Sequence, residues 1–313
     1  MGAFREMKRP KPEIPGLDII GPLGEGGMST VWKAWDKINK RLVAVKVLKR
    51  EFSARAEEVQ NFKREELAME ELHHPGIVQA YEFANDQDEW YYVMEFVDGY
   101  SFGEYLKSHG HVREEDCLLI CESVASALDY AWEQHGLVHC DLKPENIMIN
   151  QAGEIKLMDL GIAYRFQFKP DGAQEVPDHV TGTPAYISPE LVYGDVEPDC
   201  RADIYSLGAT LYHLATGHTL FEDRDTVDDM MRAHCDEASQ APDPRRYRPK
   251  LSLAFVQLLE AMLVKNREDR LSTWADVIEM CRDVENGVQF CPRTSPGASS
   301  LCIEETANEE ENP

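Results

Sequence analysis

The chain has 313 residues, of which 43% are apolar, and both values are ordinary for a globular protein of one or two domains. No run of about 18 or more apolar residues occurs, which excludes insertion into a membrane, and no apolar signal-peptide stretch opens the chain. The formal net charge of −25 disfavours nucleic acid and anionic membranes as partners and favours basic peptides, although the same acidity would also serve solubility.

The cysteines indicate a reducing compartment. All eight are scattered along the chain without a C-x-x-C pair. In a chain of this length, that pattern favours reduced thiols over a disulfide framework or a zinc site. The sequence therefore predicts a cytoplasmic protein.

A basic, proline-rich lead-in opens the chain at residues 1–16, and we expect it to be flexible. The strand-like residues 17–24 then run into the glycine-rich segment GEGGMSTV at 24–31. Glycines between strands let backbone N–H groups approach phosphate oxygens without interference from side chains. A glycine-rich loop alone is a weak indication of nucleotide binding.

The next predicted strand, residues 41–48, places Lys46 among apolar residues. Such a lysine either lies at a sheet edge, where it reaches water, or is held inside for a purpose. A lysine held inside needs a carboxylate partner, and the helical segment at 53–72 offers Glu65 on its apolar face. Glu66 satisfies nearly the same geometry, so the spacing alone does not choose between the two glutamates.

Two acids and an amide converge in the segment HCDLKPENIMINQAGEIKLMDLG, residues 139–161. Two short apolar strands with a turn between them separate Asp141 from Asp159. A hairpin of this length brings both acids to the same end of its strands. Asn146 follows Asp141 by five positions, and oxygen ligands of this kind suit Mg²⁺ held against phosphates.

The remainder of the chain is predicted to be helical. The apolar spacing indicates an amphipathic helix at 114–135 and a continuous apolar, hence buried, helix at 201–217. Three further helices are expected at 226–236, 251–264 and 272–285. Residues 286–313 are acidic and rich in turn-forming residues, which predicts a disordered tail.

These motifs resemble those of protein kinases. Segment 24–31 is similar to the family's G-x-G-x-x-G-x-V loop, with Ser29 at the third glycine. Residues 139–146 resemble H-R-D-L-x-x-x-N with Cys140 in place of arginine, and Asp159 begins a counterpart of D-F-G with leucine for phenylalanine. The match runs from about residue 17 to about residue 284 and is most similar to bacterial Ser/Thr kinases of the eukaryotic type.

The resemblance implies an α+β, two-lobed kinase fold. A small lobe of antiparallel strands with one main helix is expected at 17–97, and a larger, mainly helical lobe at 98–285. Two structural anchors follow from the same resemblance. Asp203 would hold the backbone of the catalytic loop, and Arg270 would pair with Glu190 in the counterpart of A-P-E.

An ATP site between the lobes is also implied. The residues expected to line it match the family's nucleotide motifs: Gly24, Gly26, Val31, Ala44, Lys46, Met94, Glu95, Val97 and Met148. Lys46, held by Glu65, would grip the α- and β-phosphates. Asn146 and Asp159 would hold Mg²⁺, or Mn²⁺ in its place.

On the acceptor side, the resemblance assigns Asp141 as the base that takes the hydroxyl proton and Lys143 as the cation that neutralises the γ-phosphate. Thr183 is typical of the serine/threonine class, and Glu145 favours basic residues in protein or peptide substrates. The implied activity is transfer of the γ-phosphoryl group of ATP to Ser/Thr hydroxyls. A nucleotide-binding pseudokinase scaffold and a small-molecule phosphotransferase are the alternatives.

Switching by phosphorylation is not expected. The arginine that binds an activating phosphate in many kinases is replaced by Cys140, which is uncharged. Residues 162–180 contain no Ser or Thr. The sequence therefore predicts activity that does not require phosphate in this segment.

Overall fold

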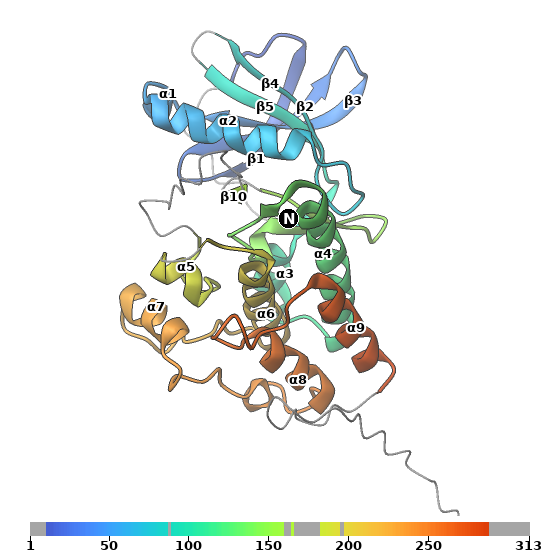
Figure 1. The fold of residues 1–313 in the computed structure, drawn as a ribbon. Helices are drawn as coiled ribbons and strands as arrows, with labels where there is room; N and C mark the ends of the chain where they lie inside the picture. The colour runs from blue at the N-terminus through green and yellow to red at the C-terminus, as the bar shows by residue number, and fades with distance from the viewer. Residues whose placement is uncertain (1–10, 87–88, 160–163, 166–181, 195–196, 288–313) are drawn as a thin grey trace, which may run out of the picture.

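The computed structural model describes residues 11–86, 89–159, 164–165, 182–194 and 197–287, with the side chains at 57, 64–68 and 164–165 outside the description. Figure 1 shows two parts, a twisted sheet crossed by a helix and a larger, mainly helical part beneath it. This is the α+β, two-lobed arrangement that the motifs predict.

The small lobe is a five-stranded antiparallel sheet in the order β1-β2-β3-β5-β4. Its strands are β1 (Leu17–Glu25), β2 (Ser29–Asp36), β3 (Arg41–Leu48), β4 (Ala80–Asp86) and β5 (Glu89–Glu95). In β3, the valines at alternate positions 43, 45 and 47 are at most 2% exposed and pack into the sheet's core. β-branched side chains favour such a pleated, buried surface.

The helix predicted at 53–72 is interrupted near its start. A short helix α1 (Arg50–Ser53) precedes α2 (Ala56–Glu70), and Arg55 between them has an extended backbone with φ −103° and ψ 112°. Phe62, Met69 and Leu72 are buried against the sheet, as the apolar spacing predicts.

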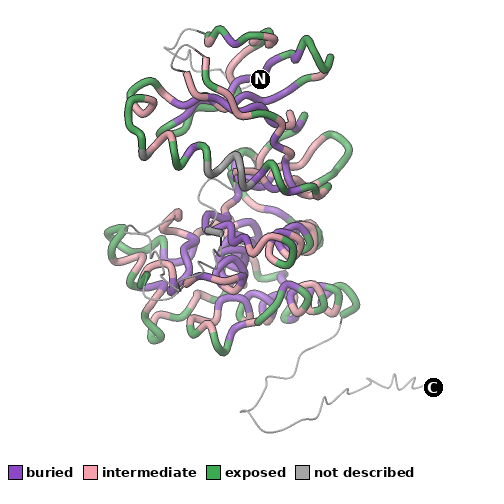
Figure 2. The backbone as a smooth tube through the Cα atoms, turned by 45° about the horizontal axis from the view of Figure 1, so that its top comes forward, coloured by how far each residue is buried: buried purple, intermediate pink, exposed green. Residues whose placement is uncertain are grey.

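The large lobe is built from helices, one of which, α6, is buried in the middle of the others (Figure 1). They are α3 (Phe102–His109), α4 (Glu114–His135), α5 (Pro189–Tyr193), α6 (Cys200–Thr216), α7 (Val227–Cys235), α8 (Leu253–Met262) and α9 (Trp274–Glu285), with the 3₁₀ turns η1 (Pro144–Asn146) and η2 (Pro244–Arg246). Figure 2 shows buried residues concentrated in the middle of this lobe. In α6, fifteen of seventeen residues are buried, which confirms the helix predicted from its continuous apolar sequence.

Short strands lie where the two lobes meet. β6 (Gly99–Ser101), β8 (Ile147–Asn150) and β9 (Ile155–Leu157) form one sheet, and β7 (Leu137–Val138) pairs with β10 (Tyr164–Arg165). The Leu157 N–H donates to the Gly76 carbonyl at 2.8 Å, and the Leu157 carbonyl accepts the Val78 N–H at 2.9 Å. Gly76 and Val78 lie between α2 and β4 of the small lobe. The hairpin that carries the predicted site is therefore fixed to both lobes.

The lead-in differs from expectation in its described part. Residues 1–10 lie outside the described residues, but Ile14 is 6% exposed and packs with Trp32 and Val43 in the core of the small lobe. The predicted tail at 286–313 lies almost wholly outside the description, and the domain boundaries stay predictions. Among the described helices, none combines the length and apolarity that crossing a membrane requires.

Candidate active site

The β8–β9 hairpin places Asn146 and Asp159 at the same end of its strands. The strands pair antiparallel with Ile147 opposite Leu157, and the Met158 amide donates to the Asn146 carbonyl at 2.9 Å. Asp159 has φ 58°, a left-handed conformation that turns the chain away from the strand and is uncommon for a residue with a side chain. Strained backbone of this kind concentrates at functional sites.

Three side chains form an acceptor cluster, which we define as Asp141, Lys143 and Thr183. Lys143 Nζ lies 2.5 Å from Asp141 Oδ2 and donates to Thr183 Oγ1 at 2.9 Å. The Thr183 hydroxyl donates to Asp141 Oδ1 at 2.6 Å. Asn146 Nδ2 donates to the Asp141 carbonyl at 2.9 Å, which links this cluster to the base of the hairpin. The structure thus brings together residues that lie up to 42 positions apart in the sequence.

The loop that carries Asp141 is held from behind by Asp203 in α6. Its carboxylate accepts the backbone N–H of His139 at 2.6 Å and that of Cys140 at 2.9 Å. Asp203 is 1% exposed, and this burial raises the pKa of its carboxyl to about 6, although the two backbone hydrogen bonds act in the opposite direction. The predicted anchor is therefore present in the geometry. Cys140 has φ 65°, so this loop also carries a left-handed residue.

Lys46 extends from β3 toward the hairpin. Its Nζ lies 2.6 Å from Asp159 Oδ1, and its side chain is 11% exposed. Its predicted partner Glu65, like Glu66, has a side chain outside the description. The ion pair with Asp159 shows that Lys46 points into the space between the lobes and not to a sheet edge.

An apolar wall adjoins Lys46. Val31 lies opposite Lys46 in the β2–β3 register, and Ala44 lies opposite Met94 in the β3–β5 register. Ala44 and Met94 are 5% and 3% exposed. The predicted lining residues Val97 and Met148 pack in the same apolar cluster as Ala44 and Met94. These contacts form a continuous apolar surface at the junction of the lobes.

The glycine-rich loop has room beside it. A side chain added at Gly24 would meet nothing within 4 Å, and one added at Gly26 would meet only Ser29, at 3.6 Å or more. Packing within the protein therefore does not require glycine at either position, whereas backbone approach to a ligand phosphate does. The carboxylate of Asp159 and the amide oxygen of Asn146 are likewise the ligand types that Mg²⁺ prefers. The residues present fit ATP and a divalent cation.

Glu95 is engaged on two sides. Its backbone N–H donates to the Gln79 carbonyl at 2.8 Å, and its carboxylate lies 2.7 Å from Lys156 Nζ in β9. The side chain therefore connects the end of β5 in the small lobe to the β8–β9 hairpin. Sequence reasoning missed this pair because Glu95 and Lys156 are 61 positions apart and neither belongs to a local pattern.

The segment 182–194, which carries Thr183 and ends in α5, is fixed by a buried ion pair. Arg270 donates to Glu190 Oε1 at 2.7 Å and to Oε2 at 3.1 Å, and the two side chains are 0% and 6% exposed. Further back in the segment, the Tyr186 hydroxyl lies 2.7 Å from His213 Nδ1 in α6. Glu145 is exposed nearby on η1, and its charge acts on both Tyr186 and His213.

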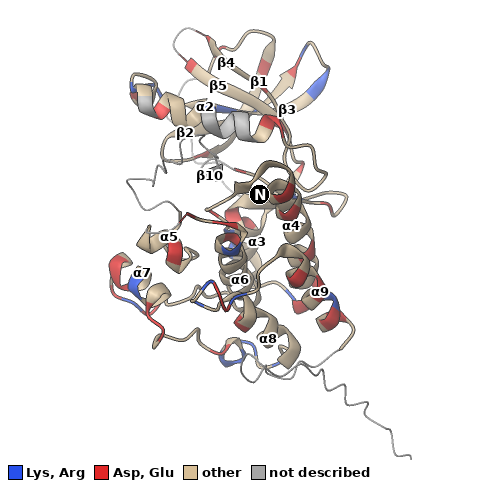
Figure 3. Cartoon of the chain, viewed as in Figure 1, with Lys and Arg blue, Asp and Glu red and all other residues tan. Residues whose placement is uncertain are grey.

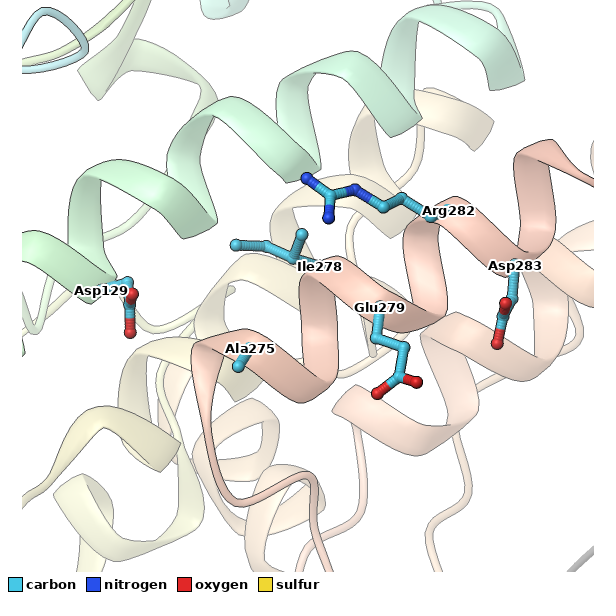
Figure 4. Close-up of a pocket in the computed structure, with 6 residues that line it drawn as sticks. All are labelled: Asp129, Ala275, Ile278, Glu279, Arg282 and Asp283. Atoms are coloured by element: carbon cyan, nitrogen blue, oxygen red, sulfur yellow. The ribbon is translucent and has the colours of Figure 1, made fainter.

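A separate groove of about 560 Å³ lies between α4 and α9 (Figure 4). Its lining is mostly charged, with Asp129, Glu279, Asp283 and Arg282 around Ala275 and Ile278. Arg282 is already bound to Glu122 at 2.7 Å. None of the predicted site residues lines this groove, so it is distinct from the site between the lobes.

Comparisons with known proteins agree with this geometry. The model of the protein kinase domain family matches residues 17–282. A "probable serine/threonine-protein kinase" of Clostridium acetobutylicum is 33% identical over 84% of this chain and 39% of its own length. The serine/threonine-protein kinase PrkC of Bacillus subtilis is 32% identical over 83% of this chain and 39% of its own length. The chain thus spans about two fifths of the curated relatives that it matches.

The crystal structure of the PknI kinase domain of Mycobacterium tuberculosis has the same fold. It superposes with a TM-score of 0.66 at 24% identity and covers 87% of this chain and 97% of the PknI domain. The likeness at this identity concerns the fold.

Proposed function

Because the chain belongs to the protein kinase domain family, we propose that it is an ATP-dependent protein kinase that transfers the γ-phosphoryl group to Ser/Thr hydroxyls of protein substrates. The observation that carries the proposal is the acceptor cluster. A threonine hydroxyl lies 2.6 Å from Asp141 Oδ1 and 2.9 Å from Lys143 Nζ. A carboxylate and an ammonium group that share one hydroxyl are the arrangement that phosphoryl transfer to a hydroxyl needs.

In the proposed mechanism, Asp141 orients the acceptor hydroxyl and takes its proton as the bond from the acceptor oxygen to the γ-phosphorus forms. The bond from that phosphorus to the bridging oxygen breaks, and ADP leaves with the electron pair. Lys143 offsets the negative charge on the transferred group. Lys46 positions the α- and β-phosphates. Mg²⁺ held by Asn146 and Asp159 would supply positive charge against the phosphate oxygens.

The supporting distances agree with these roles. Asp141 is 9% exposed, so a proton transferred to it is shielded from bulk water. Lys46 Nζ already lies 2.6 Å from Asp159 Oδ1, which brings the phosphate-binding cation next to the predicted metal ligand. An active kinase is expected to carry four polar residues in this site, and all four are present: Lys46, Asp141, Asn146 and Asp159. Their presence does not favour a pseudokinase scaffold.

Transfer of radiolabelled phosphate from ATP to a panel of peptides in Mg²⁺ is the direct test. We expect phosphoserine and phosphothreonine products with the wild-type chain and a loss of about 10³-fold or more with Asp141→Asn. Asp129→Asn, in the α4–α9 groove, is the matched control and should retain activity. Nucleotide binding without transfer by the wild-type chain would support the scaffold, and dominant phosphotyrosine would contradict the Ser/Thr assignment.

We propose further that substrates carry basic residues before the acceptor. The support is the exposed Glu145 beside the acceptor cluster, together with the acidic positions that Figure 3 colours red along α4, α7 and α9. Burial lowers the pKa of His213, near Glu145, which disfavours a positive charge there that would repel a basic residue. Peptides with arginine or alanine before the acceptor should differ in KM, and Glu145→Gln should reduce that difference.

We propose also that the chain is active without phosphate between Asp159 and Thr183, a stretch whose one Ser or Thr is Thr181. The Cys140 side chain is 3% exposed and packs in an apolar cluster with Val138 and Ala202, which offers a phosphate no cation. Phosphatase-treated protein, checked by mass spectrometry, should retain its initial rate, as should Thr181→Ala. A loss of most activity in either folded protein would contradict this part of the proposal.

A cytoplasmic location is proposed on the described cysteines, which form no disulfide with one another. We also propose that residues 17–97 and 98–285 form the two lobes of one catalytic domain. Limited proteolysis with mass spectrometry would test the boundary at 285, because a folded core should resist cleavage up to that position.

A further inference from the structure

A short stretch of the large lobe is strongly basic. Residues 243–250 read DPRRYRPK and hold four cations against one acid, in a chain whose formal net charge is −25. They form the turn η2 and the connection that leads into α8, where Figure 3 colours several positions blue. We call residues 245–250 the basic loop. A positive surface in so acidic a protein attracts negatively charged groups.

Of the four cations, one is held in an ion pair within the described part of the chain. Arg245 donates to the two carboxylate oxygens of Asp243, at 3.1 and 2.8 Å. Arg246 and Lys250 are exposed and Arg248 is half-buried, and no described carboxylate forms an ion pair with these three. Nη1 of Arg248 also has no hydrogen-bonded partner among the described residues. The basic loop therefore keeps donors that carboxylates from outside it can satisfy.

Two contacts of α4 place the basic loop near the end of α9. Glu114, the first residue of α4, accepts the N–H of Ser252 at 2.8 Å, and Ser252 follows the basic loop by two positions. Eight positions further along α4, Glu122 lies 2.7 Å from Arg282 in the last turn of α9. Eight helical residues rise about 12 Å, so with the side-chain lengths the basic loop and the end of α9 lie within about 40 Å of each other.

A negatively charged segment of the same chain follows α9. Residues 304–311, which we call the acidic segment, read EETANEEE and carry five glutamates and no cation. Sixteen residues, 288–303, connect this segment to the last described residue. A chain of that length extends to at most about 54 Å, and a flexible one averages about 22 Å, so it can reach the basic loop. A tethered segment competes at an effective concentration in the millimolar range, which favours it over a separate partner of the same charge.

We propose that the basic loop is a docking surface for the acidic segment of the same chain. Glutamate carboxylates bind the guanidinium groups of Arg246 and Arg248 and the ammonium group of Lys250 through charge-assisted hydrogen bonds. Exposed pairs of this kind are individually weak, so docking needs both the tether and several pairs at once. The docked segment closes the basic loop to other acidic partners. This inference is independent of phosphoryl transfer.

Zero-length cross-linking of the full chain with a carbodiimide tests the contact, because this reagent joins a lysine amine to a carboxylate only where the two meet. Mass spectrometry should find Lys250 joined to the acidic segment. The yield should be at least about fivefold above that of Lys107, an exposed lysine of α3 in the same lobe. Raising the salt from about 0.05 M to about 0.5 M shortens the screening length from about 14 Å to about 4 Å, and the yield should fall severalfold.

Paired substitutions separate the basic loop from charge in general. Arg246→Gln with Arg248→Gln removes two cations of the loop and should lower the Lys250 yield at least about fivefold. Arg224→Gln with Arg232→Gln removes the same charge from exposed positions outside the loop and is the matched control, with an unchanged yield. Arg246→Lys with Arg248→Lys keeps the charge, and its two new amines should also be joined to the acidic segment.

Three results would overturn the inference: a Lys250 yield no higher than that of Lys107, an equal yield after Arg246→Gln with Arg248→Gln, or cross-links of the acidic segment to the lysines of the lead-in instead. A mixture of nitrogen-14 and nitrogen-15 chains identifies the chain that contributes the segment. Cross-linked peptides of a single isotope support docking within one chain. Predominantly mixed pairs would identify a second copy as the occupant and refute the proposal.

Discussion

Removal of Arg270 should destabilise the large lobe more than removal of any arginine on its surface. The guanidinium is 0% exposed and donates to both oxygens of Glu190. It also donates to the carbonyls of Arg201, Val264 and Lys265 at 2.5, 2.7 and 3.0 Å. Every N–H group of the guanidinium therefore donates a hydrogen bond.

The loss in free energy of unfolding follows from the groups that Arg270→Met would leave without a partner. The Glu190 carboxylate would remain 6% exposed without its cation, and three carbonyls would lose a donor. Breaking a buried pair in this way costs about 3–5 kcal/mol, a large share of the roughly 5–15 kcal/mol by which domains are stable. Arg270→Met with Glu190→Met removes the stranded charge and should recover about 2 kcal/mol of the loss.

Urea unfolding followed by tryptophan fluorescence measures both variants. Arg245→Met is a matched control, because Arg245 makes a similar two-pronged contact with Asp243 on the surface, where the two side chains are 40% and 42% exposed. Its unfolding midpoint should not move measurably. A cost of less than about 1 kcal/mol for Arg270→Met, or a double variant no more stable than the single one, would refute the stabilising role of this buried pair.

Three further outcomes are expected. Gly182→Ala should lower stability by about 2 kcal/mol and reduce transfer, since φ is +125° and the new carbon would lie 2.8 Å from the Cys140 carbonyl; normal stability would refute this. The Asp203 carboxyl, with its pKa raised to about 6 from 3.8, stabilises the fold most below pH 4. That contribution, about 3 kcal/mol, is lost as the pH rises through 6. Turnover, in contrast, should fall as the pH is lowered below 6, because a protonated Asp203 carboxyl is a poor acceptor for the two backbone N–H groups. A rate that stays flat from pH 7 to 5 would contradict this. Thr183→Ser should keep most activity and Thr183→Ala should lose about tenfold or more, because only serine keeps the hydroxyl between Asp141 and Lys143; equal rates would refute the role of this hydroxyl.

Local patterns were sufficient for the elements that carry the site. The helix predicted at 114–135 has those bounds in the structure, because its apolar residues repeat at helical spacing. Helices α7, α8 and α9 lie within two residues of their predicted ends. The antiparallel hairpin between Asp141 and Asp159 follows from strand length and a turn, which are also local properties.

Contacts between distant segments were not readable from the same patterns. The pairs Glu95–Lys156 and Tyr205–His234 join residues 61 and 29 positions apart, and neither the spacing nor the residue type singles them out. The break before α2 depends on one extended residue, Arg55, which has nothing in its type to mark it. Arg270 and Glu190 were paired in advance only because the family resemblance supplied the pairing.

The position of Cys140 shows how the catalytic loop is fixed without an arginine. Its backbone N–H is bound by Asp203 at 2.9 Å, and its carbonyl lies so near Gly182 that only glycine fits there without displacement. Its side chain is covered by Val138 and Ala202. These contacts hold the backbone from both sides without a phosphate group, and they support the proposal that activity does not require a charged side chain at residue 140. Since residues 162–180 offer no Ser or Thr, an arginine introduced by Cys140→Arg would gain no phosphate to bind within that segment and would lose the apolar contacts that now hold the loop.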